Sequence, residues 1–593
     1  MSAWDTFFLA AGGVIGSGWL LSPVQAGEKQ WEWPVLTWLT GGALMLVIAA
    51  VMVELSIRAP KTGGLIFLPL QSSGPLLATV VAAAVWAYYA VNPASEAVAM
   101  VRGLAVAGNC TLESALVHAD AQGRAYGLSA GGIGVALGFL LVLAAVNLLG
   151  ARLFLLVNNV LTAFKILVPL LVLALVLYTA VFRLQPRPVP PGACSPFLVL
   201  EMPPPHDMST MLGTLGSGGV IYTYLGFQGP LDFAGNVRRR GIGEAARLRR
   251  AVYGTVAGSV VLYIALQFAV IYVLKDLPGQ GTAAGARLPQ LLYPEFAQKF
   301  APGWTAGPVS WLVNIDAVLS PAGTGMVFIF VLTREVAALS RARLTHRGLQ
   351  RRRYSVVPLA SRRLRRLFRD DRLDLYWLIL IVDLVVSALA LTTVDGNWSV
   401  LSILNSSMSL VAYATPSVVL AALRRRDRQR FPGPWYSLLA RAGFASAAFT
   451  LFLTGFFAPE GDLLWQGAVA LTTGCALLFG LPLMLRASRW YDATAHATGF
   501  RELRTNPAAR SAALLYGFYA GLVLVTLLAR YLWPVWPAQA GVPLDIAGLA
   551  VLAAGSWLTF RWLTEWSVRY MGTEGQAPTL PDPMPGPAGP APR

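Results

Sequence analysis

Long apolar stretches alternate with short polar ones along nearly the whole chain. Each apolar stretch is about twenty residues long, the length that an α-helix needs to cross the hydrocarbon core of a bilayer. The pattern therefore predicts about fourteen membrane-spanning helices. We expect them near residues 5–24, 35–57, 76–104, 130–149, 156–182, 210–234, 251–274, 309–334, 374–394, 399–423, 436–457, 464–486, 511–532 and 544–566.

Two of these stretches are interrupted by residues that break helices. Gly16-Ser17-Gly18 falls well inside the first, and Gly226, Gly229 and Pro230 fall inside the sixth. In a bilayer, a helix break survives only where protein or a water-filled cavity satisfies the freed backbone groups. Taken alone, Gly-x-Gly suits a helix-packing face equally well. Two corresponding breaks in two halves of a chain favour a central transport site.

Composition and charge support a membrane protein with many spans. The chain has 593 residues, of which 56% are hydrophobic and 13% are charged, against roughly 25% charged in soluble proteins. The net charge of +17 lies mostly in alternate loops, which is the positive-inside pattern and argues against nucleic-acid binding. The arginine-rich loops at 238–250, 341–372 and 424–430 are therefore predicted to be cytoplasmic. Both termini are predicted to be cytoplasmic as well, and the protein is predicted to lie in the inner (cytoplasmic) membrane.

Four further expectations concern the loops and the tail. The three cysteines and four histidines lack metal-ligand spacing, so no metal site is expected. Cys110 and Cys194 fall in loops on the same outer side, and a disulfide between them stays open. The segment 341–373 is either an arginine-rich amphipathic helix on lipid or a solvated topology signal. The Pro/Gly-rich tail, residues 572–593, is predicted to be disordered.

Six motifs follow one another in order along residues 5–425. They are Gly13-Val14-Ile15-Gly16-Ser17-Gly18; Glu54-Leu55 with Pro60 and Gly63-Gly64; Asn147-Leu148-Leu149-Gly150-Ala151; Lys165-Ile166-Leu167-Val168-Pro169; Tyr224-Leu225-Gly226-Phe227; and Asp316-Ala317 with Ser320-Pro321, Gly323-Thr324-Gly325 and Thr333-Arg334. Together they resemble the amino acid–polyamine–organocation (APC) permeases, and most of all the subgroup that includes aspartate–proton symporters. The resemblance implies a five-plus-five inverted-repeat fold, with repeats at 1–182 and 210–425 and four additional helices at 436–566.

The two breaks are predicted to hold the substrate. Amide groups at the start of a half-helix suit a carboxylate, and the carbonyl oxygens of an unwound segment suit an ammonium group. The resemblance puts an amino acid's carboxylate at Ser17 and Gly18. It puts the amino group at the carbonyls of Val14, Ile15, Tyr222 and Leu225, with Tyr222 as a lid. Simple core packing stays open for Tyr222 and Tyr224. The predicted binding residues are Val14, Ile15, Gly16, Ser17, Gly18, Glu96, Tyr222, Thr223, Tyr224, Leu225, Gly226 and Gln228.

Lys165 is a single cation inside an apolar stretch. Such a charge costs about 2.5–3.5 kcal/mol at mid-bilayer on insertion scales, and loss of water disfavours the charged form of an amine. The resemblance implies that Lys165 stands where sodium-coupled relatives hold a cation, so Lys165 is the predicted proton-coupling group. The alternative is a lysine that reaches to the membrane interface. The hydroxyls of Ser320 and Thr324 would suit sodium, but Lys165 beside them would repel it.

Two carboxylates inside spans have open roles. Glu96 and Asp316 either contact the substrate side chain, pair with Arg102 or with each other, or support the fold. Asp232, beyond the sixth-span break, is expected to cap a helix or anchor a gate. Gln228 stands where many relatives carry a charged residue, so the resemblance does not carry over the charge of the substrate.

These features predict an amino acid importer driven by proton symport, with the proton as the coupling ion and no other cofactor. The resemblance implies that spans 1, 2, 6 and 7 rock against spans 3, 4, 8 and 9. An exchanger of amino acids or polyamines shares the same motifs, and a non-transporting sensor with the permease fold is a further alternative. An enzyme is not expected, because no nucleophile–base pair or paired-carboxylate constellation stands at one membrane face. The expected partners are an amino acid and the bilayer, and the sequence does not indicate the oligomeric state.

Overall fold

The structure of the protein is a computed structural model. It describes residues 3–29, 33–60, 63–107, 110–119, 125–148, 151–182, 197–200, 208–232, 243–275, 286–289, 306–351, 376–457, 463–484, 510–532 and 543–573.

Helices dominate the described residues, as the apolar pattern predicts. The long helices are α3 (Pro34–Arg58), α5 (Pro75–Ala107), α7 (Ala130–Leu148), α8 (Ala151–Val181), α12 (Gly243–Lys275), α14 (Ala306–Arg341), α17 (Trp377–Thr393), α18 (Trp398–Arg426), α19 (Trp435–Leu453), α20 (Leu463–Met484), α22 (Arg510–Leu532) and α23 (Leu544–Thr573). The short ones are α1 (Ala3–Val14), α2 (Gly18–Lys29), α4 (Gly64–Ser73), α6 (Cys110–Leu116), α9 (Met208–Ser217), α10 (Val220–Thr223), α11 (Gly229–Asp232) and the 3-10 helix η1 (Arg347–Gln350).

Eleven helical segments in the described ranges are long and apolar enough to cross a membrane. Two shorter apolar helices, at 377–393 and 464–478, and the interrupted segment 208–232 fall where three further spans are expected. A protein that crosses the membrane many times is therefore confirmed. The count of fourteen and the five-plus-five symmetry stay predictions.

Helix α5 is the centre of the bundle, and it packs against α14, α18, α17, α20, α4 and α7. Its many alanines let neighbouring backbones come close. At Gly103, a β-carbon would lie 2.8 Å from the carbonyl oxygen of Ala317 in α14. By contrast, α8 exposes a row of large apolar side chains, as expected of a helix that faces lipid: Leu156, Val160, Leu167, Leu170 and Leu177.

Both predicted breaks are present. The first separates α1 from α2 at residues 15–17. The second is more extensive than expected, because the chain is interrupted at residues 218–219 as well as at 224–228. Gly219 has a φ of 71°, in the left-handed region that favours glycine. The two interrupted segments lie side by side, since α2 packs against α10 and α1 against α11.

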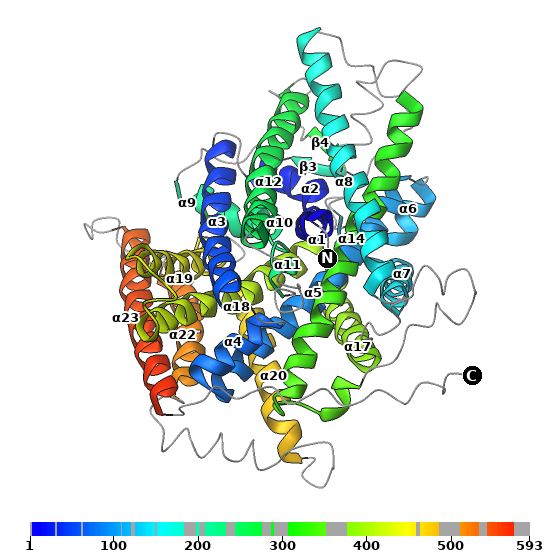
Figure 1. Ribbon diagram of the computed structural model, residues 1–593. Helices are drawn as coiled ribbons and strands as arrows, with labels where there is room; N and C mark the ends of the chain where they lie inside the picture. Colours follow the sequence, from blue (N-terminus) through cyan, green and yellow to red (C-terminus); the bar gives the residue numbers. More distant parts are fainter. Residues whose placement is uncertain are drawn as a thin grey trace, which may run out of the picture.

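The last four helices join the core instead of forming a separate unit. Helix α19 packs against α18 and α3, α20 against α5 and α18, and α23 against α18 and α4. Figure 1 shows α19, α22 and α23 gathered on one flank, beside α3. Their division from the repeats at residue 436 stays a prediction.

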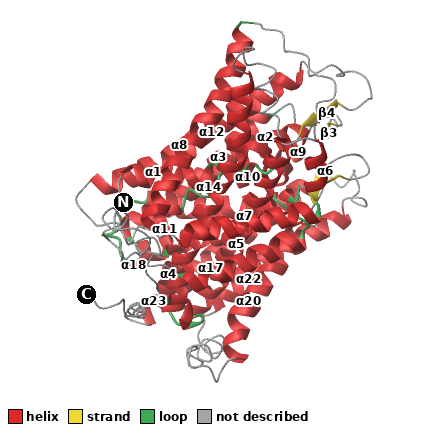
Figure 2. Cartoon of the chain, turned by 90° about the vertical axis from the view of Figure 1, so that its right-hand side faces the viewer, coloured by secondary structure: helices red, strands yellow, loops and turns green. Residues whose placement is uncertain are grey.

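The structure contains two small antiparallel strand pairs that the sequence analysis does not predict. Strand β1 (Val117–Ala119) pairs with β2 (Ala125–Leu128), and β3 (Phe197–Leu200) pairs with β4 (Ala286–Pro289). Figure 2 shows both pairs toward the same end of the bundle. The second pair joins two loops that the charge pattern places on the same side of the membrane.

Several expectations fall outside the described residues. They are the disorder of the tail beyond residue 573, most of the basic segment 341–373, and Cys194, so a disulfide between Cys194 and Cys110 stays open. Within the described part, we define the arginine-rich end of the bundle as the end where α3, α14 and α18 finish and α12 begins.

Candidate functional site

The first break binds a carboxylate of the protein itself, at the place predicted for the carboxylate of the substrate. The amide nitrogen of Ser17 donates a hydrogen bond to Glu96 Oε2 at 2.8 Å. Ser17 stands just before α2, whose first turn presents amide groups that favour negative charge. The amide that we expected to hold the substrate carboxylate therefore holds Glu96 of α5 in this structure. Glu96 does not form the alternative pair with Arg102, whose Nε has no hydrogen-bond partner among the described residues.

Tyr222 in α10 closes this cluster from the side of the second break. Its hydroxyl donates to Glu96 Oε1 at 2.6 Å and lies 2.7 Å from Ser95 Oγ. The ring of Trp398, at the start of α18, packs edge-on against the Tyr222 ring, with centroids 5.3 Å apart. The Trp398 indole nitrogen donates to Ser17 Oγ at 3.1 Å. Tyr222 is thus joined to the first break through Glu96, and its role as a lid stays a prediction.

Lys165 in α8 is fully buried and points into the core. Its Nζ donates to the carbonyl oxygen of Gly12 at 2.6 Å and to Thr324 Oγ1 at 3.0 Å, with Ser320 O at 3.4 Å. Thr324 Oγ1 lies 2.9 Å from Gly12 O and 3.0 Å from Ile15 O. The alternative interpretation, that Lys165 reaches to the membrane interface, is therefore wrong. The amine sits in a nest of oxygens at the end of α1, as expected for a cation site.

Asp316 lies in α14, one turn before Ser320, and is also fully buried. It adds a negative charge near Lys165, and so does Glu96. Ser320 Oγ accepts a hydrogen bond from the Trp19 indole at 3.2 Å. Ser320, through its carbonyl oxygen, and Thr324, through its hydroxyl, thus contact the Lys165 amine from α14; their part in coupling stays a prediction.

Three of the four carbonyl groups that we expected to accept from a substrate ammonium have donors in the protein, two of them at the first break and one at the second. Val14 O accepts from the Tyr263 hydroxyl at 3.3 Å, Ile15 O from Thr324 at 3.0 Å, and Tyr222 O from the Leu225 amide at 3.1 Å. Each carbonyl oxygen has a second lone pair, so these bonds leave capacity for a ligand.

Gly13 and Gly226 bring the two breaks into direct backbone contact. A β-carbon on Gly226 would lie 2.2 Å from the carbonyl oxygen of Gly13, and one on Gly13 would lie 2.5 Å from that of Gly226. Gly226 has a φ of 106°, which other residues rarely adopt. Only glycine satisfies both requirements at residue 226.

Gln228 lies at the centre of a group of tyrosines next to the second break. Its Oε1 accepts from the Gly226 amide at 3.1 Å and from the Tyr413 hydroxyl at 2.6 Å. Its Nε2 donates to the hydroxyls of Tyr88 at 3.0 Å and Tyr89 at 3.3 Å. The side chain is 1% exposed. Gln228 is fully engaged in holding the break, away from Glu96 and Ser17.

The structure separates other predicted residues from the cluster. Tyr224 donates to the Trp38 carbonyl at 3.0 Å and packs on the Trp38 and Tyr263 rings, which is the core-packing alternative. The Thr223 hydroxyl donates to its own helix, at Val220 O.

Sequence reasoning missed Trp398, Ser95, Asn92 and Tyr263. Asn92, Ser95 and Glu96 follow the spacing of one helical face in an otherwise apolar span, a signal that could have found them. No comparable pattern marks Trp398.

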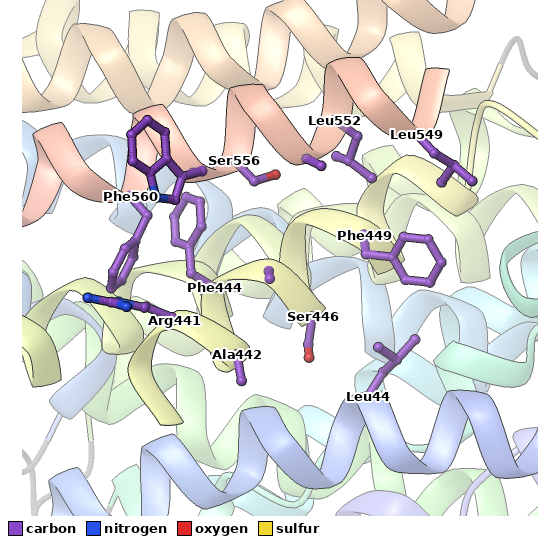
Figure 3. Close-up of a pocket in the computed structure, with 13 residues that line it drawn as sticks. Leu44, Arg441, Ala442, Phe444, Ser446, Phe449, Leu549, Leu552, Ser556 and Phe560 are labelled. Atoms are coloured by element: carbon purple, nitrogen blue, oxygen red, sulfur yellow. The ribbon is translucent and has the colours of Figure 1, made fainter. Parts of the chain in front are cut away.

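A cavity of about 610 Å³ lies apart from this cluster, between α3, α19 and α23. Figure 3 shows its mainly apolar side chains, with Arg441 and Ser556 among them. None of the predicted site residues lines it, so the candidate site rests on the two breaks.

Comparison with known proteins agrees with this architecture. Residues 1–481 match the family model described as amino acid permease, and the chain belongs to that family of transporters. It is similar to the glutamate/serine transporter AimA of Bacillus subtilis, 24% identical over 84% of this chain and 83% of the relative. It is also similar to the aspartate-proton symporter of the same organism, 22% identical over 96% of this chain and 98% of the relative.

Proposed function

We propose that this protein imports an amino acid together with a proton, through alternating exposure of the two facing breaks. The observation that carries the proposal is the placement of Lys165: a buried amine bound to the Gly12 carbonyl and the Thr324 hydroxyl, at the end of α1. In sodium-coupled relatives, the resemblance implies a bound cation at this point. The Lys165 amine would take its place, and an amine can gain or lose a proton.

Glu96 is the group that couples proton binding to substrate binding in this proposal. An amino acid whose carboxylate binds the Ser17 amide must displace or approach the Glu96 carboxylate. Two carboxylates beside one another in a buried site favour uptake of a proton. By thermodynamic linkage, a bound proton then favours the substrate to the same extent. Lys165, whose charge acts on Glu96, is the group that passes this effect to α1 and α14.

The orientation of the protein in the membrane is inferred from the charge pattern. Arginine-rich loops face the cytoplasm in most membrane proteins, so the arginine-rich end is proposed to be the cytoplasmic end, in the inner membrane. One charge that crosses a potential of 100 mV releases about 2.3 kcal/mol, enough for roughly a fiftyfold gradient of substrate. The names of the two relatives make glutamate, serine and aspartate the first substrates to test.

The test is uptake of radiolabelled amino acids into proteoliposomes, with an inward proton gradient, no sodium and an empty lumen. We expect wild-type protein to accumulate substrate against its gradient. Lys165→Ala removes the amine that contacts both the Gly12 carbonyl oxygen and Thr324 Oγ1, so it is expected to abolish gradient-driven accumulation while substrate binding persists. Arg569→Ala, in an exposed pair with Glu565, is the control and is expected to transport like wild type.

Three results would contradict the proposal. Accumulation that needs preloaded internal substrate and ignores the proton gradient would indicate an exchanger. Undiminished gradient-driven uptake by Lys165→Ala would remove Lys165 from the coupling. Binding without flux in every condition would indicate a sensor.

A further inference from the structure

Two carboxyl groups meet at the arginine-rich end, away from the lysine pocket. Asp232 is the last residue of α11, and Glu335 lies in α14; they are 1% and 0% exposed. Their carboxyl groups lie close enough to interact with each other. An ionised carboxylate only accepts hydrogen bonds, so a hydrogen bond between the two groups would require a proton on one of them. Two ionised carboxylates in contact without water would repel strongly.

The other oxygens of the pair are held by neutral donors. The Tyr89 hydroxyl donates to Asp232 Oδ2 at 2.7 Å, and the Ile66 amide, in the first turn of α4, donates to Glu335 Oε2 at 3.3 Å. Glu335 Oε1 has no hydrogen-bond partner among the described residues when both acids are treated as acceptors. A proton shared within the pair satisfies this buried oxygen.

The surroundings of the pair supply no compensating cation within the described ranges. The titratable groups near the pair are tyrosines: Tyr88 and Tyr89 from α5, and Tyr413 from α18. The guanidinium of Arg334, the neighbour of Glu335 in α14, lies over the rings of Phe330 and Tyr376, at 4.9 and 5.3 Å from their centroids. From the described part of the α3–α4 connection, the Gly63 amide donates to the Asp232 carbonyl, and the Ile66 amide at the start of α4 donates to Glu335. A shared proton would compensate the charge of this buried pair.

The pair ties together three segments that differ in their expected motion. Asp232 ends the broken helix, Glu335 belongs to α14, and Gly63 links them by donating its amide to the Asp232 carbonyl at 3.1 Å. Loss of the proton would leave two buried negative charges in contact. They would separate and take up water, which opens this end of the second break.

We propose that Asp232 and Glu335 form a proton-binding site that holds the arginine-rich end closed while a proton is shared and releases it when the proton leaves. The site is separate from Lys165. It rests on the proposed function only in that this end faces the cytoplasm. A higher pH on that side removes the shared proton and favours the open end, whereas a lower pH favours the closed end.

The first test detects the proton itself. Infrared difference spectra of the purified protein, taken across a pH titration, report the carbonyl stretch of protonated carboxyl groups. Asp232→Asn and Glu335→Gln keep the shape and can still hydrogen bond to the remaining acid. Each is expected to remove the same titrating band. Asp383→Asn, which removes another buried carboxyl group in α17, is expected to leave that band in place.

The second test detects opening. Leu231, beside Asp232, is 3% exposed, so in Leu231→Cys a membrane-impermeant maleimide reaches the new thiol only when this end opens. We expect labelling to rise with pH by up to about tenfold per pH unit, as for a single-proton equilibrium. In Leu231→Cys with Asp232→Asn or Glu335→Gln, labelling is expected to stay slow at every pH. With Asp383→Asn, the pH dependence is expected to persist.

Neither readout uses substrate or a proton gradient, so both stand even if proton-coupled uptake fails. Leu231→Cys with Lys165→Ala is expected to keep the pH-dependent labelling, which separates the two proton sites. A titrating band that survives both amide substitutions would overturn the proposal. So would pH dependence of labelling that is equal in the parent and both amide variants, or absent from the parent.

Discussion

The two helix breaks touch each other, yet they are satisfied by different chemistry. At the first break the partners are charged: Glu96 accepts from the Ser17 amide, and Lys165 donates to the Gly12 carbonyl. At the second break the partners are neutral, since Gln228 accepts from the Gly226 amide and is surrounded by tyrosine hydroxyls. A buried ion needs a counter-charge or a proton, whereas a buried amide needs only hydrogen bonds.

This difference assigns different sensitivities to the two breaks. Binding of a charged substrate or a proton acts on the first break, where it changes the charge balance around Ser17. Among the described residues, the side chain that accepts from the backbone of the second break is the neutral Gln228. The Asp232–Glu335 pair lies further on, at the end of α11. Substitutions at the second break should therefore change stability and motion more than pH dependence.

The largest effect is expected for Gly226→Ala, which attacks the contact between the breaks. A φ of 106° costs a non-glycine residue about 1–3 kcal/mol, and the new methyl group would lie 2.2 Å from the Gly13 carbonyl oxygen. We expect little folded protein by size-exclusion chromatography and a lowered melting temperature. Gly134→Ala in α7, where nothing lies within 4 Å, should fold normally. Equal melting of both variants would show that the contact is not required.

A smaller effect is expected for Gln228→Leu, which keeps the size of the side chain but removes its polar groups. The Gly226 amide and the Tyr413 hydroxyl lose their acceptor, and each buried unsatisfied group costs about 1–3 kcal/mol. Thermal unfolding should show the loss, while the pH dependence of substrate binding stays that of wild type. Gln466→Leu, half-buried in α20 and outside both breaks, is the matched control and should unfold like wild type. A shifted pH profile in Gln228→Leu would contradict the neutral character of the second break.

The smallest effect is expected for Trp398→Phe, at the edge of the first break. The change removes one hydrogen bond to Ser17 Oγ but keeps a ring against Tyr222. Because a hydrogen bond contributes about 0.5–1.5 kcal/mol, substrate affinity measured by equilibrium binding should fall by at most about tenfold. Trp465→Phe, in α20 and 46% exposed, should bind like wild type. A complete loss of binding would show that Trp398 does more than orient Ser17.

Much of this arrangement was predictable because its signals are local in sequence. Apolar length predicted the spans, and glycine placement predicted both breaks. A lone lysine in an apolar stretch predicted a buried cation, and Lys165 is indeed buried against α1 and α14. The pairing of Glu96 with Ser17 was not predictable, because it depends on the distance between two helices that are 79 residues apart.

The same limit applies to acids and aromatic residues far apart in the chain. Asp232 read alone suggests a helix cap, and Glu335 carries no pattern of its own; their chemistry exists only because α11 and α14 meet. Tyr222 and Tyr224 have the same local context, and only the rotation of α10 sends Tyr222 to Glu96 and Tyr224 to Trp38. Helix rotation is set by packing on all sides, which the local sequence does not specify.

The backbone contact between Gly13 and Gly226 also restricts how this chain can evolve. Each glycine faces a main-chain carbonyl, which no substitution elsewhere can make smaller. Enlarging either residue is therefore not compensated by changing the other, since both are already the smallest amino acid. The two positions are expected to be intolerant of mutation together. A saturation library selected for growth should return glycine at both, whereas the polar partners around them admit covariation.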